Sequence, residues 1–413
     1  MPFSMAASHM AGKSATDKIF GAAAAANAAK AKIGKENVVD TTIGVLLDNS
    51  EKLVVLPTVE KVYKNLPMAE IVPYAGIAGM PDFLEMVQVA AFGDNRPEGY
   101  TKAVSTSGGS GAIHHTIWNY SEVGDTILTH DWYWDPYSVL SDALLRKLDT
   151  FSLFDAANKF DIKSFEGKVN GLLAKQDSLV VILNTPAHNP VGYSLSDSEW
   201  DQVLDVLKKT KPGKKITLLV DIAYIDYAGE KNASRAFMKK FGGLPENILV
   251  VIGYSMSKGY TVYGMRTGAM IGISSSQDVA NEFASVNQYL SRATWSNINR
   301  GAQHLLTAIY KDAAVQADLE KERAGYYKMM AERAEMFTAE AKEAKLAMLP
   351  YIAGFFLSIP AKNPDAVCTR LHADNVFAVP LAKGVRVAVC ALPAGKIKGV
   401  PTKIAKAMAE VDK

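Results

Sequence analysis

The fold class is decided by residues 178–224, which read SLVVILNTPAHNPVGYSLSDSEWDQVLDVLKKTKPGKKITLLVDIAY. Two apolar runs, 178–184 and 216–224, are continuous rather than alternating, which is typical of strands buried on both faces of a sheet. Between them, Ser196 can cap a helix over 196–210. The apolar residues that recur there at helical spacing are Trp200, Val203, Leu204 and Leu207. A strand, a helix and a second strand in this order predict an α/β unit with a mostly parallel sheet.

The alternation continues outward from this unit. Further apolar, β-branched runs predict strands over 125–130, 247–255 and 267–274. Residues 300–346 then read as nearly unbroken helix, rich in Ala, Glu, Lys and Met. Short strands are expected again over 354–360 and 384–392, before an amphipathic helix that closes the chain.

We therefore expect an α/β protein of two domains behind an N-terminal extension. The extension is residues 1–16, whose Ser-His-Met stretch is compatible with a cloning remnant and which lacks the features of a signal peptide. Residues 53–315 are expected to form a large domain with a mostly parallel central sheet flanked by helices. A smaller α+β domain is expected from both chain ends, with 17–52 as an N-terminal arm and part of that domain, and 316–413 as the rest.

Composition narrows the class of protein. The 413 residues carry 45 Lys and Arg against 43 Asp and Glu, a formal net charge of +2, which argues against a nucleic-acid or membrane-surface binder. No apolar run reaches the ~18 residues that span a bilayer. Cys368 and Cys390 are too few for a disulfide framework or a four-ligand zinc site, so a cytoplasmic location is expected. His114 and His115 are adjacent and diverge, so we expect packed histidines and no metal site.

Two segments suggest where an anion and a ligand could bind. In STSGGSGAIHHTIWNY (105–120), a glycine-rich run precedes a helical pattern, and the backbone N–H groups of a helix N-terminus favour an anion. In ILNTPAHNPVGYSL (182–195), Asn189 follows a strand, and open α/β sheets bind ligands in the crevice at the carboxyl ends of their strands. Each segment alone is equally compatible with an ordinary turn.

Two more segments place charged groups after buried strands. Asp221 closes the apolar run of LLVDIAYIDY (218–227), where a carboxylate is costly unless a cation or a proton pairs with it. In GYSMSKGYTVYGMRTG (253–268), Lys258 follows a strand with few carboxylates nearby, which favours a lowered pKa of its ammonium group. Taken singly, Asp221 is also compatible with a turn cap and Lys258 with a solvated surface lysine.

Together these segments resemble the pyridoxal-phosphate-dependent aminotransferases of fold type I, and among them the aspartate and aromatic amino acid aminotransferases. The resemblance rests on HNPVG, DIAY and SMSKGYTVYGMR in this order and spacing, and it extends over residues 17–392. Jointly the three motifs are specific, whereas one of them alone is not. The resemblance implies pyridoxal 5'-phosphate as the cofactor and a homodimer with shared active sites.

The resemblance also implies roles at the cofactor. Lys258 is expected to hold it as a Schiff base and to shuttle a proton, while Asp221 pairs with the protonated pyridine nitrogen. Asn189 and Tyr224 are expected to bond the ring oxygen O3′. The residues expected at the phosphate are Gly109, Ser110, Ser255 and Arg266, together with Tyr74 donated by the second subunit.

One aromatic residue is expected to stack on the cofactor ring. Trp134 in DWYWDPY (131–137) matches it, and Trp132 is the alternative. The choice is open because Asp135 stands after Trp134 where the family has a small residue, and Pro136-Tyr137 replaces the family's second polar pair. An aromatic cluster that only packs is the structural explanation of this stretch.

Substrate contacts follow from the same resemblance. Arg386 in GVRVAVCAL matches the arginine that forks onto the substrate α-carboxylate, beside Asn189. Gly44 belongs to the Ile43-Gly44 stretch that covers the substrate. Arg292 in SRATWSNINRGA (291–302) matches an arginine that reads the distal carboxylate from the neighbouring subunit. This favours aspartate, glutamate and 2-oxoglutarate, yet the same arginine swings aside for aromatic side chains in this subgroup. A surface ion pair is the alternative explanation of Arg292.

The expected function is therefore transfer of the amino group of aspartate or an aromatic amino acid to 2-oxoglutarate. The alternative that keeps the cofactor is a β-lyase or decarboxylase acting on a small amino acid. A cofactor-binding regulator on the same fold would carry an N-terminal DNA-binding module, for which the roughly 35 residues ahead of the matched core are too few.

Overall fold

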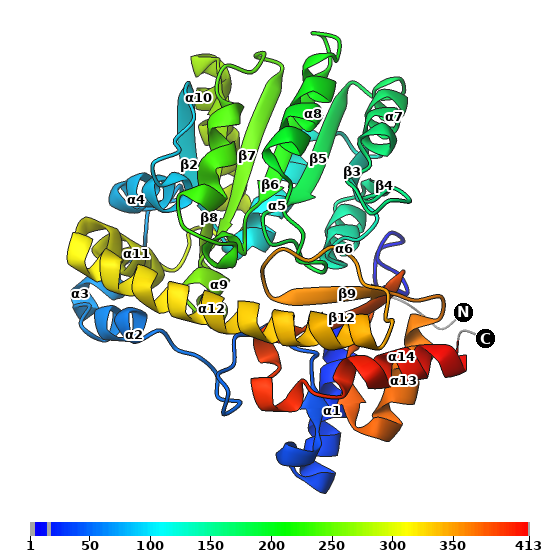
Figure 1. The fold of residues 1–413 in the computed structure, drawn as a ribbon. Helices are drawn as coiled ribbons and strands as arrows, with labels where there is room; N and C mark the ends of the chain where they lie inside the picture. The colour runs from blue at the N-terminus through cyan, green and yellow to red at the C-terminus, as the bar shows by residue number, and fades with distance from the viewer. Residues whose placement is uncertain (1–4, 15–17, 412–413) are drawn as a thin grey trace.

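Seven strands form one sheet in the order β2-β8-β7-β6-β5-β3-β4 (Figure 1). Their bounds are β2 Tyr100–Thr106, β3 Thr126–His130, β4 Lys147–Phe151, β5 Ser178–Asn184, β6 Lys215–Asp221, β7 Ile248–Ser255 and β8 Gly268–Ser274. The neighbours from β7 to β4 pair in parallel, and β8 runs antiparallel to both β2 and β7. The predicted α/β class and mostly parallel sheet are confirmed.

The computed structural model describes residues 5–14 and 18–411. Residues 1–4, 15 and 16 of the expected N-terminal extension therefore lie outside the described residues. Within the described ranges, no helix combines the length and the apolar character that crossing a membrane requires.

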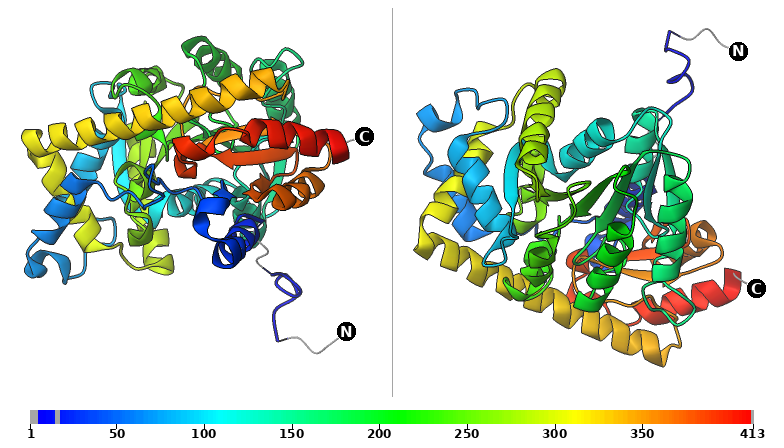
Figure 2. Two further views of the ribbon diagram at one scale, coloured as in Figure 1. Left: turned by 60° about the horizontal axis from the view of Figure 1, so that its bottom comes forward. Right: turned by 90° about the horizontal axis from the view of Figure 1, so that it is seen from above.

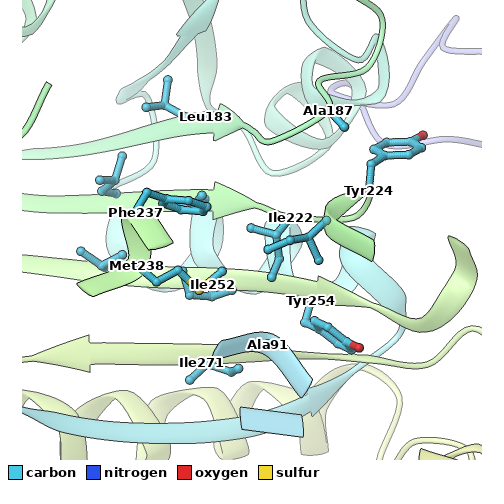
Figure 3. Packing of buried hydrophobic residues seen from close by; sticks show 14 of the residues in the cluster. Ala91, Leu183, Ala187, Ile222, Tyr224, Phe237, Met238, Ile252, Tyr254 and Ile271 are labelled. Carbon is cyan, nitrogen blue, oxygen red and sulfur yellow. The ribbon is translucent and has the colours of Figure 1, made fainter. Parts of the chain in front are cut away.

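Both faces of the large sheet are covered, which explains its continuous apolar runs. In β5, Leu179, Val181 and Leu183 join one buried cluster, whereas Val180 and Ile182 join another on the opposite face. Helices that pack in the first cluster include α4 Pro81–Phe92, α7 Ile162–Leu173 and α8 Asp197–Lys208. Those in the second are α5 Gly108–Tyr120, α6 Pro136–Ala143 and α10 Gln277–Thr294. Figure 3 shows part of the first cluster, from Leu183 across Ile252 to Ile271.

The helix of the opening segment forms as expected. The side chain of Ser196 accepts a hydrogen bond from the Glu199 backbone N–H, and the Glu199 carboxylate accepts one from the Ser196 N–H in return. This capping box fixes the start of α8. Trp200, Val203, Leu204 and Leu207 are buried, as their spacing predicts.

Two strands of the sheet were missed by the sequence reasoning. β2 and β4 are its two edge strands, and each begins with exposed or half-buried residues. Edge strands carry polar side chains, so they lack the continuous apolar run that marks the interior strands.

The expected unbroken helix over 300–346 is two helices, α11 Arg300–Lys311 and α12 Ala313–Glu343. The break falls at Asp312, whose extended backbone ends α11 and whose side chain accepts hydrogen bonds from the N–H groups of Ala314 and Val315. An aspartate in this position is a helix N-cap rather than a helix interior residue. Figures 1 and 2 show α12 running from beneath the large sheet to the C-terminal strands.

The two chain ends fold against each other below the large sheet. β1 Val39–Asp40 pairs with β10 Val376–Phe377, and a three-stranded sheet has the order β11-β12-β9. Its strands are β9 Phe356–Pro360, β11 Val379–Pro380 and β12 Gly384–Ala388, so the expected strand over 384–392 ends early, in a 3₁₀ turn at Val389–Ala391. Helices α13 Pro364–Leu371 and α14 Val400–Val411 share a separate apolar cluster with β9 and β12.

The remaining helices lie along the N-terminal part of the chain and after β7. They are α1 Lys18–Ile33, α2 Pro57–Lys64, α3 Met68–Ile71 and α9 Met256–Gly259. Figure 1 shows α1 beside the C-terminal elements, far along the chain from it. The domain boundaries themselves stay a prediction.

Candidate active site

A cavity of about 350 Å³ opens at the carboxyl ends of β5, β6 and β7. Its walls come from three parts of the chain: the N-terminal region, the ends of the large sheet, and the C-terminal strands. Of the residues predicted for the site, it is lined by Gly44, Gly109, Ser110, Trp134, Asn189, Asp221, Tyr224, Ser255, Lys258, Arg266 and Arg386. A volume of this size suits a small organic ligand.

Lys258 lies in the short helix α9, directly after β7. Its Nζ donates a hydrogen bond to the carbonyl oxygen of Gly44 at 3.2 Å and lies 4.9 Å from the centre of the Tyr263 ring. Burial lowers the pKa of Lys258 to about 8, with a smaller lowering from Arg266 and Arg386 and an opposing effect of Asp221 and Cys390. This is the direction expected from the sequence, and a pKa of about 8 leaves about a tenth of the amine unprotonated at pH 7.

Asp221 is the last residue of β6 and is buried. Its Oδ2 accepts a hydrogen bond from the Tyr137 hydroxyl at 2.7 Å, and its Oδ1 accepts one from the Ala223 N–H at 3.1 Å. Burial raises the pKa of Asp221, while these two hydrogen bonds and the charge of Lys258 oppose that rise. The site therefore holds a desolvated carboxylate that a cation would stabilise.

Asn189 and Tyr224 meet beside Asp221. The Asn189 Nδ2 donates to the Tyr224 hydroxyl at 3.1 Å, and the Asn189 backbone N–H donates to Oδ1 of Asn184 at 2.7 Å. The same Asn184 donates through Nδ2 to the backbone carbonyl of Asp221 at 2.8 Å, so one side chain ties the ends of β5 and β6 together. Within the described chain, the buried Oδ1 of Asn189 has no hydrogen-bond partner. Such an atom is costly to leave unpaired, which indicates a ligand group.

Groups that can donate hydrogen bonds to an anion come from α5 and the loop after α9. Gly109 and Ser110 stand in the first turn of α5, where backbone N–H groups have no partner within the helix. Arg266 adopts a left-handed backbone with φ 49° and donates from Nη1 to the Ser257 hydroxyl at 3.0 Å. Gly108 has φ 64°, a left-handed backbone that favours glycine, and a Cβ there would lie 2.9 Å from the Arg266 Nη2.

The choice between the two candidate tryptophans is settled by position. Trp134 lines the cavity, whereas Trp132 does not line it and is buried in the larger apolar cluster. Trp132 packs so close to Gly384 that a Cβ there would lie 2.7 Å from its ring. The alternative Trp132 is therefore wrong as a cavity residue.

Arg386 enters the cavity from β12. Its Nη2 donates to the Thr42 carbonyl at 2.8 Å, and its guanidinium lies 4.3 Å from the centre of the Phe356 ring. The side chain is buried, so its charge is little screened by water. Together with Lys258 and Arg266, it makes the cavity of a nearly neutral chain locally cationic.

Tyr74 and Arg292 do not line the cavity of their own chain. Tyr74 is 87% exposed, and Arg292 is exposed at the end of α10, where it donates to the Ser296 hydroxyl at 2.5 Å. Both were assigned to the neighbouring subunit's site, which one chain does not test, so both stay predictions.

Several cavity residues were missed by the sequence reasoning. Tyr263 stands within the quoted lysine segment, and its hydroxyl also accepts a hydrogen bond from the Leu46 N–H at 2.9 Å. Phe356, Ile19 and Phe20 come from elements remote in the chain and carried no local signal.

His115 is a packed residue as expected, since its ring stacks on that of Trp295 with the ring centroids 4.2 Å apart. Within residues 5–14 and 18–411, no three His, Cys, Asp or Glu side chains are grouped as a metal site requires.

Comparison with known proteins gives one family and many similar structures. The family model "Aminotransferase class I and II" matches residues 36–404. An aminotransferase structure from Anaerococcus prevotii is 37% identical, with a TM-score of 0.96, over 98% of this chain and all of that one. A second solved structure is an aromatic amino acid aminotransferase from Burkholderia pseudomallei, covalently bound to pyridoxal phosphate. It is 23% identical with a TM-score of 0.79, and the match covers 98% of this chain and 100% of that one. It shows the shared fold.

Curated relatives are more distant. The aromatic-amino-acid aminotransferase of Pseudomonas aeruginosa is 26% identical over 293 residues, which are 69% of this chain and 71% of the relative. That of Paracoccus denitrificans is 23% identical over 267 residues, 63% of this chain. The matched region spans 65% of the Paracoccus enzyme, just under two thirds of its length.

Proposed function

Because the chain belongs to the class I and II aminotransferase family, we propose that it transfers the amino group of aspartate or an aromatic amino acid to 2-oxoglutarate, with pyridoxal phosphate linked to Lys258. One observation carries this proposal. Lys258, Asp221 and Arg386, which come from three separate elements, line a single cavity of about 350 Å³.

The residues of the cavity fit pyridoxal phosphate. The buried carboxylate of Asp221 suits a protonated pyridine nitrogen, and the buried Oδ1 of Asn189, which has no hydrogen-bond partner among the described residues, can accept from a bound ligand. Gly109, Ser110, Ser255 and Arg266 would hold the phosphate, by helix N–H groups and a guanidinium. Trp134 would lie against the ring, and Tyr224 would complete the polar contacts at the ring oxygen.

When bound, pyridoxal phosphate supplies an electron sink for the electrons released at the substrate Cα. Lys258, once the substrate amine has displaced it from the cofactor, would be the base that takes the proton from the substrate Cα and delivers it to the C4′ carbon of the cofactor. Its pKa of about 8 lies much nearer to neutral pH than that of an ordinary lysine, which makes it suited to general acid–base work. Asp221 holds the positive charge of the pyridine nitrogen, so the electron sink is preserved.

Arg386 orients the substrate. Its guanidinium can donate two parallel hydrogen bonds to an α-carboxylate, which fixes both the position and the plane of the amino acid. The contact from Nη2 to the Thr42 carbonyl and the Phe356 ring beneath it hold the side chain in place. Ile43 and Gly44 line the same cavity, and their apolar surface helps to exclude water.

We further propose a homodimer in the cytoplasm. The second subunit would supply Tyr74 to the phosphate and Arg292 to the distal carboxylate of a dicarboxylic substrate. The exposure of both side chains in the single chain supports this, since a partner can reach them. Both cysteines are buried thiols, in keeping with a reducing compartment.

The test is product formation by the purified protein with pyridoxal phosphate. Aspartate, tyrosine and phenylalanine are each paired with 2-oxoglutarate, and glutamate and the new 2-oxo acid are measured. Formation of both products supports the proposal. Release of ammonia or carbon dioxide without glutamate would instead assign a lyase or decarboxylase reaction.

A further inference from the structure

Arg300 holds a turn of the chain that presents an exposed tyrosine. It is the first residue of α11, and its guanidinium donates from Nε to the backbone carbonyl of Glu70 at 2.9 Å and from Nη1 to that of Tyr74 at 3.5 Å. These two carbonyl groups stand at the two ends of the segment 70–74, which begins in α3 and leaves it. One side chain therefore links both ends of this segment, the Tyr74 turn.

Side-chain contacts hold the guanidinium of Arg300 in place. Its Nη2 donates to Oε2 of Glu70 at 3.3 Å, and the same oxygen lies 2.9 Å from Nε2 of His304, one turn further along α11. The Arg300 side chain is only 23% exposed, so water screens this attraction less than it would on an open surface. A guanidinium carries its donors in a rigid fork, which suits three acceptors spread around one point.

The start of α11 also packs against the Tyr74 turn and the residues that follow it. A Cβ at Gly301 would lie 3.1 Å from the Cγ2 of Ile71, so the helix backbone and the turn are in close contact. Further along α11, the Oε1 of Gln303 accepts a hydrogen bond from the Met80 N–H at 2.8 Å. Figure 1 shows α11 beside α3. The loop that carries Tyr74 is therefore fixed to one helix on both sides of that residue.

The side chains of the turn face away from their own chain. Met68, Val72 and Tyr74 are between 67% and 87% exposed, and none of them lines the cavity. Large apolar side chains exposed together on a surface mark a contact with another protein. The turn is therefore fixed at its base and open at its tip, which is what contact with a second copy of the chain requires.

We propose that Arg300 is a positioning residue for the site of the neighbouring subunit, because it holds the Tyr74 turn so that the Tyr74 hydroxyl is presented to the cofactor phosphate bound there. The inference rests on the proposed function and deepens it. A tyrosine whose loop is ordered before binding loses less conformational entropy when it contacts the phosphate. Arg300 acts through Tyr74 and across the interface, and it does not line the cavity of its own chain.

Cofactor loading of Lys258 measures the effect. Each apoprotein is incubated with increasing pyridoxal phosphate and treated with borohydride, and the pyridoxyl label on Lys258 is quantified by mass spectrometry to give a half-saturating concentration. Arg300→Met removes the guanidinium and keeps the aliphatic stem. Arg370→Met is the matched control, since Arg370 is 27% exposed and ion-paired with Asp374 at 2.8 Å, on α13 and outside the cavity.

The expected losses follow from the route through Tyr74. Tyr74→Phe raises the half-saturating concentration roughly tenfold, the loss of a hydrogen bond to a charged group. Arg300→Met raises it roughly fivefold, adds nothing further in a Tyr74→Phe background, and Arg370→Met leaves it unchanged. A change below about twofold in Arg300→Met, or fully additive losses in the double variant, would overturn the proposal.

A hybrid dimer tests whether Arg300 acts across the interface. Lys258→Ala and Arg300→Met chains with different affinity tags are expressed together, and the dimer that carries both tags is purified. Its one site with a lysine takes Lys258 from the Arg300→Met chain and Tyr74, held by an intact Arg300, from the other chain. The half-saturating concentration is expected to return to within about twofold of wild type. A value that stays higher would show that Arg300 acts within its own chain and would overturn the proposal.

Arg300→Lys covers the case in which Arg300→Met does not fold. A lysine keeps the positive charge beside Glu70, but its compact ammonium does not reproduce the fork that reaches both carbonyl groups, so a loss of roughly threefold is expected, restored in the hybrid. Wild-type loading in the Arg300→Lys homodimer would show that charge alone suffices and would contradict the bridging role. An active monomer, or wild-type loading in Tyr74→Phe, would instead overturn the shared site of the proposed function.

Discussion

Lys258 donates a hydrogen bond from its Nζ to the carbonyl oxygen of Gly44, at 3.2 Å, although 214 residues separate them in the chain. The N-terminal segment is thereby brought onto the amine at the centre of the cavity. A weak neutral acceptor replaces the carboxylate that a buried ammonium would prefer, in keeping with the lowered pKa of Lys258. The amine is available for chemistry rather than locked in an ion pair.

Replacing this amine should remove the transfer reaction. Lys258→Ala is expected to lower kcat by roughly a thousandfold or more, because the variant loses the group that moves the proton. Steady-state rates with aspartate and 2-oxoglutarate check this. Lys208→Ala is the control, since Lys208 is a solvent-exposed lysine of α8 that pairs with Asp205. A Lys258→Ala enzyme with more than a tenth of wild-type kcat would refute the assigned role.

The apoprotein should gain stability with pH through Lys258. Its pKa is lowered to about 8 from 10.5, so between these values the unfolded chain binds a proton that the folded chain has released. The stability contributed by this group is therefore present above pH 10.5 and lost as pH falls through about 8. Replacing the lysine by an uncharged residue of similar size should remove this dependence.

Chemical denaturation of the wild-type apoprotein and of Lys258→Met, at a series of pH values, measures the effect. The difference in unfolding free energy should favour Lys258→Met near pH 7 and shrink as pH rises above 8. A difference that stays constant from pH 7 to pH 10 would show that Lys258 titrates as an ordinary lysine.

Asp221 should lower the stability of the apoprotein at neutral pH and strengthen its binding of the cofactor. Its pKa is raised by burial, so the stability it contributes is present below its unfolded value of 3.8 and lost as pH rises through the folded value. At neutral pH, Asp221→Asn should therefore stabilise the apoprotein by about 1 kcal/mol while weakening its hold on pyridoxal phosphate. Thermal unfolding of the apoprotein measures the change in stability, and titration with pyridoxal phosphate measures the change in affinity. A variant that loses both stability and affinity would indicate that Asp221 is a structural residue.

Substitution of Arg386 and of Arg292 should lower kcat/KM for different sets of amino donors. Arg386→Ala is expected to lower kcat/KM roughly a hundredfold for aspartate and phenylalanine alike, because both donors carry the α-carboxylate. Arg292→Ala is expected to lower it for aspartate only, because phenylalanine has no distal carboxylate. The check is the kcat/KM of each variant relative to wild type, for aspartate and for phenylalanine, measured under one condition. Equal losses for both donors in Arg292→Ala would leave that residue without a role in selectivity.

Much of the site could be predicted because its chemistry sits at the ends of the interior strands. Asn189, Asp221 and Lys258 each follow a long apolar run, and parallel strands bring their carboxyl ends to one edge of the sheet. The order of the motifs along the chain was therefore enough to predict that these three residues lie around one ligand site.

The rest depended on contacts that no local pattern encodes. Tyr137 bonds Asp221 across 84 residues, and the choice of Trp134 over Trp132 depends on which face of the loop meets the cavity. The edge strands β2 and β4 were missed because their outer residues are polar. The break at Asp312 was missed because a capping aspartate differs little from a helix surface residue in an Ala- and Glu-rich run.

The central claim is that Lys258 carries the cofactor, and it can be tested by direct chemical mapping. The protein, purified with pyridoxal phosphate, is treated with borohydride to make the linkage permanent, digested, and analysed by mass spectrometry. The account predicts one modified peptide, with the added pyridoxyl phosphate mass on Lys258. A modification on any other lysine, or an unmodified protein that nevertheless catalyses the transfer, would contradict it.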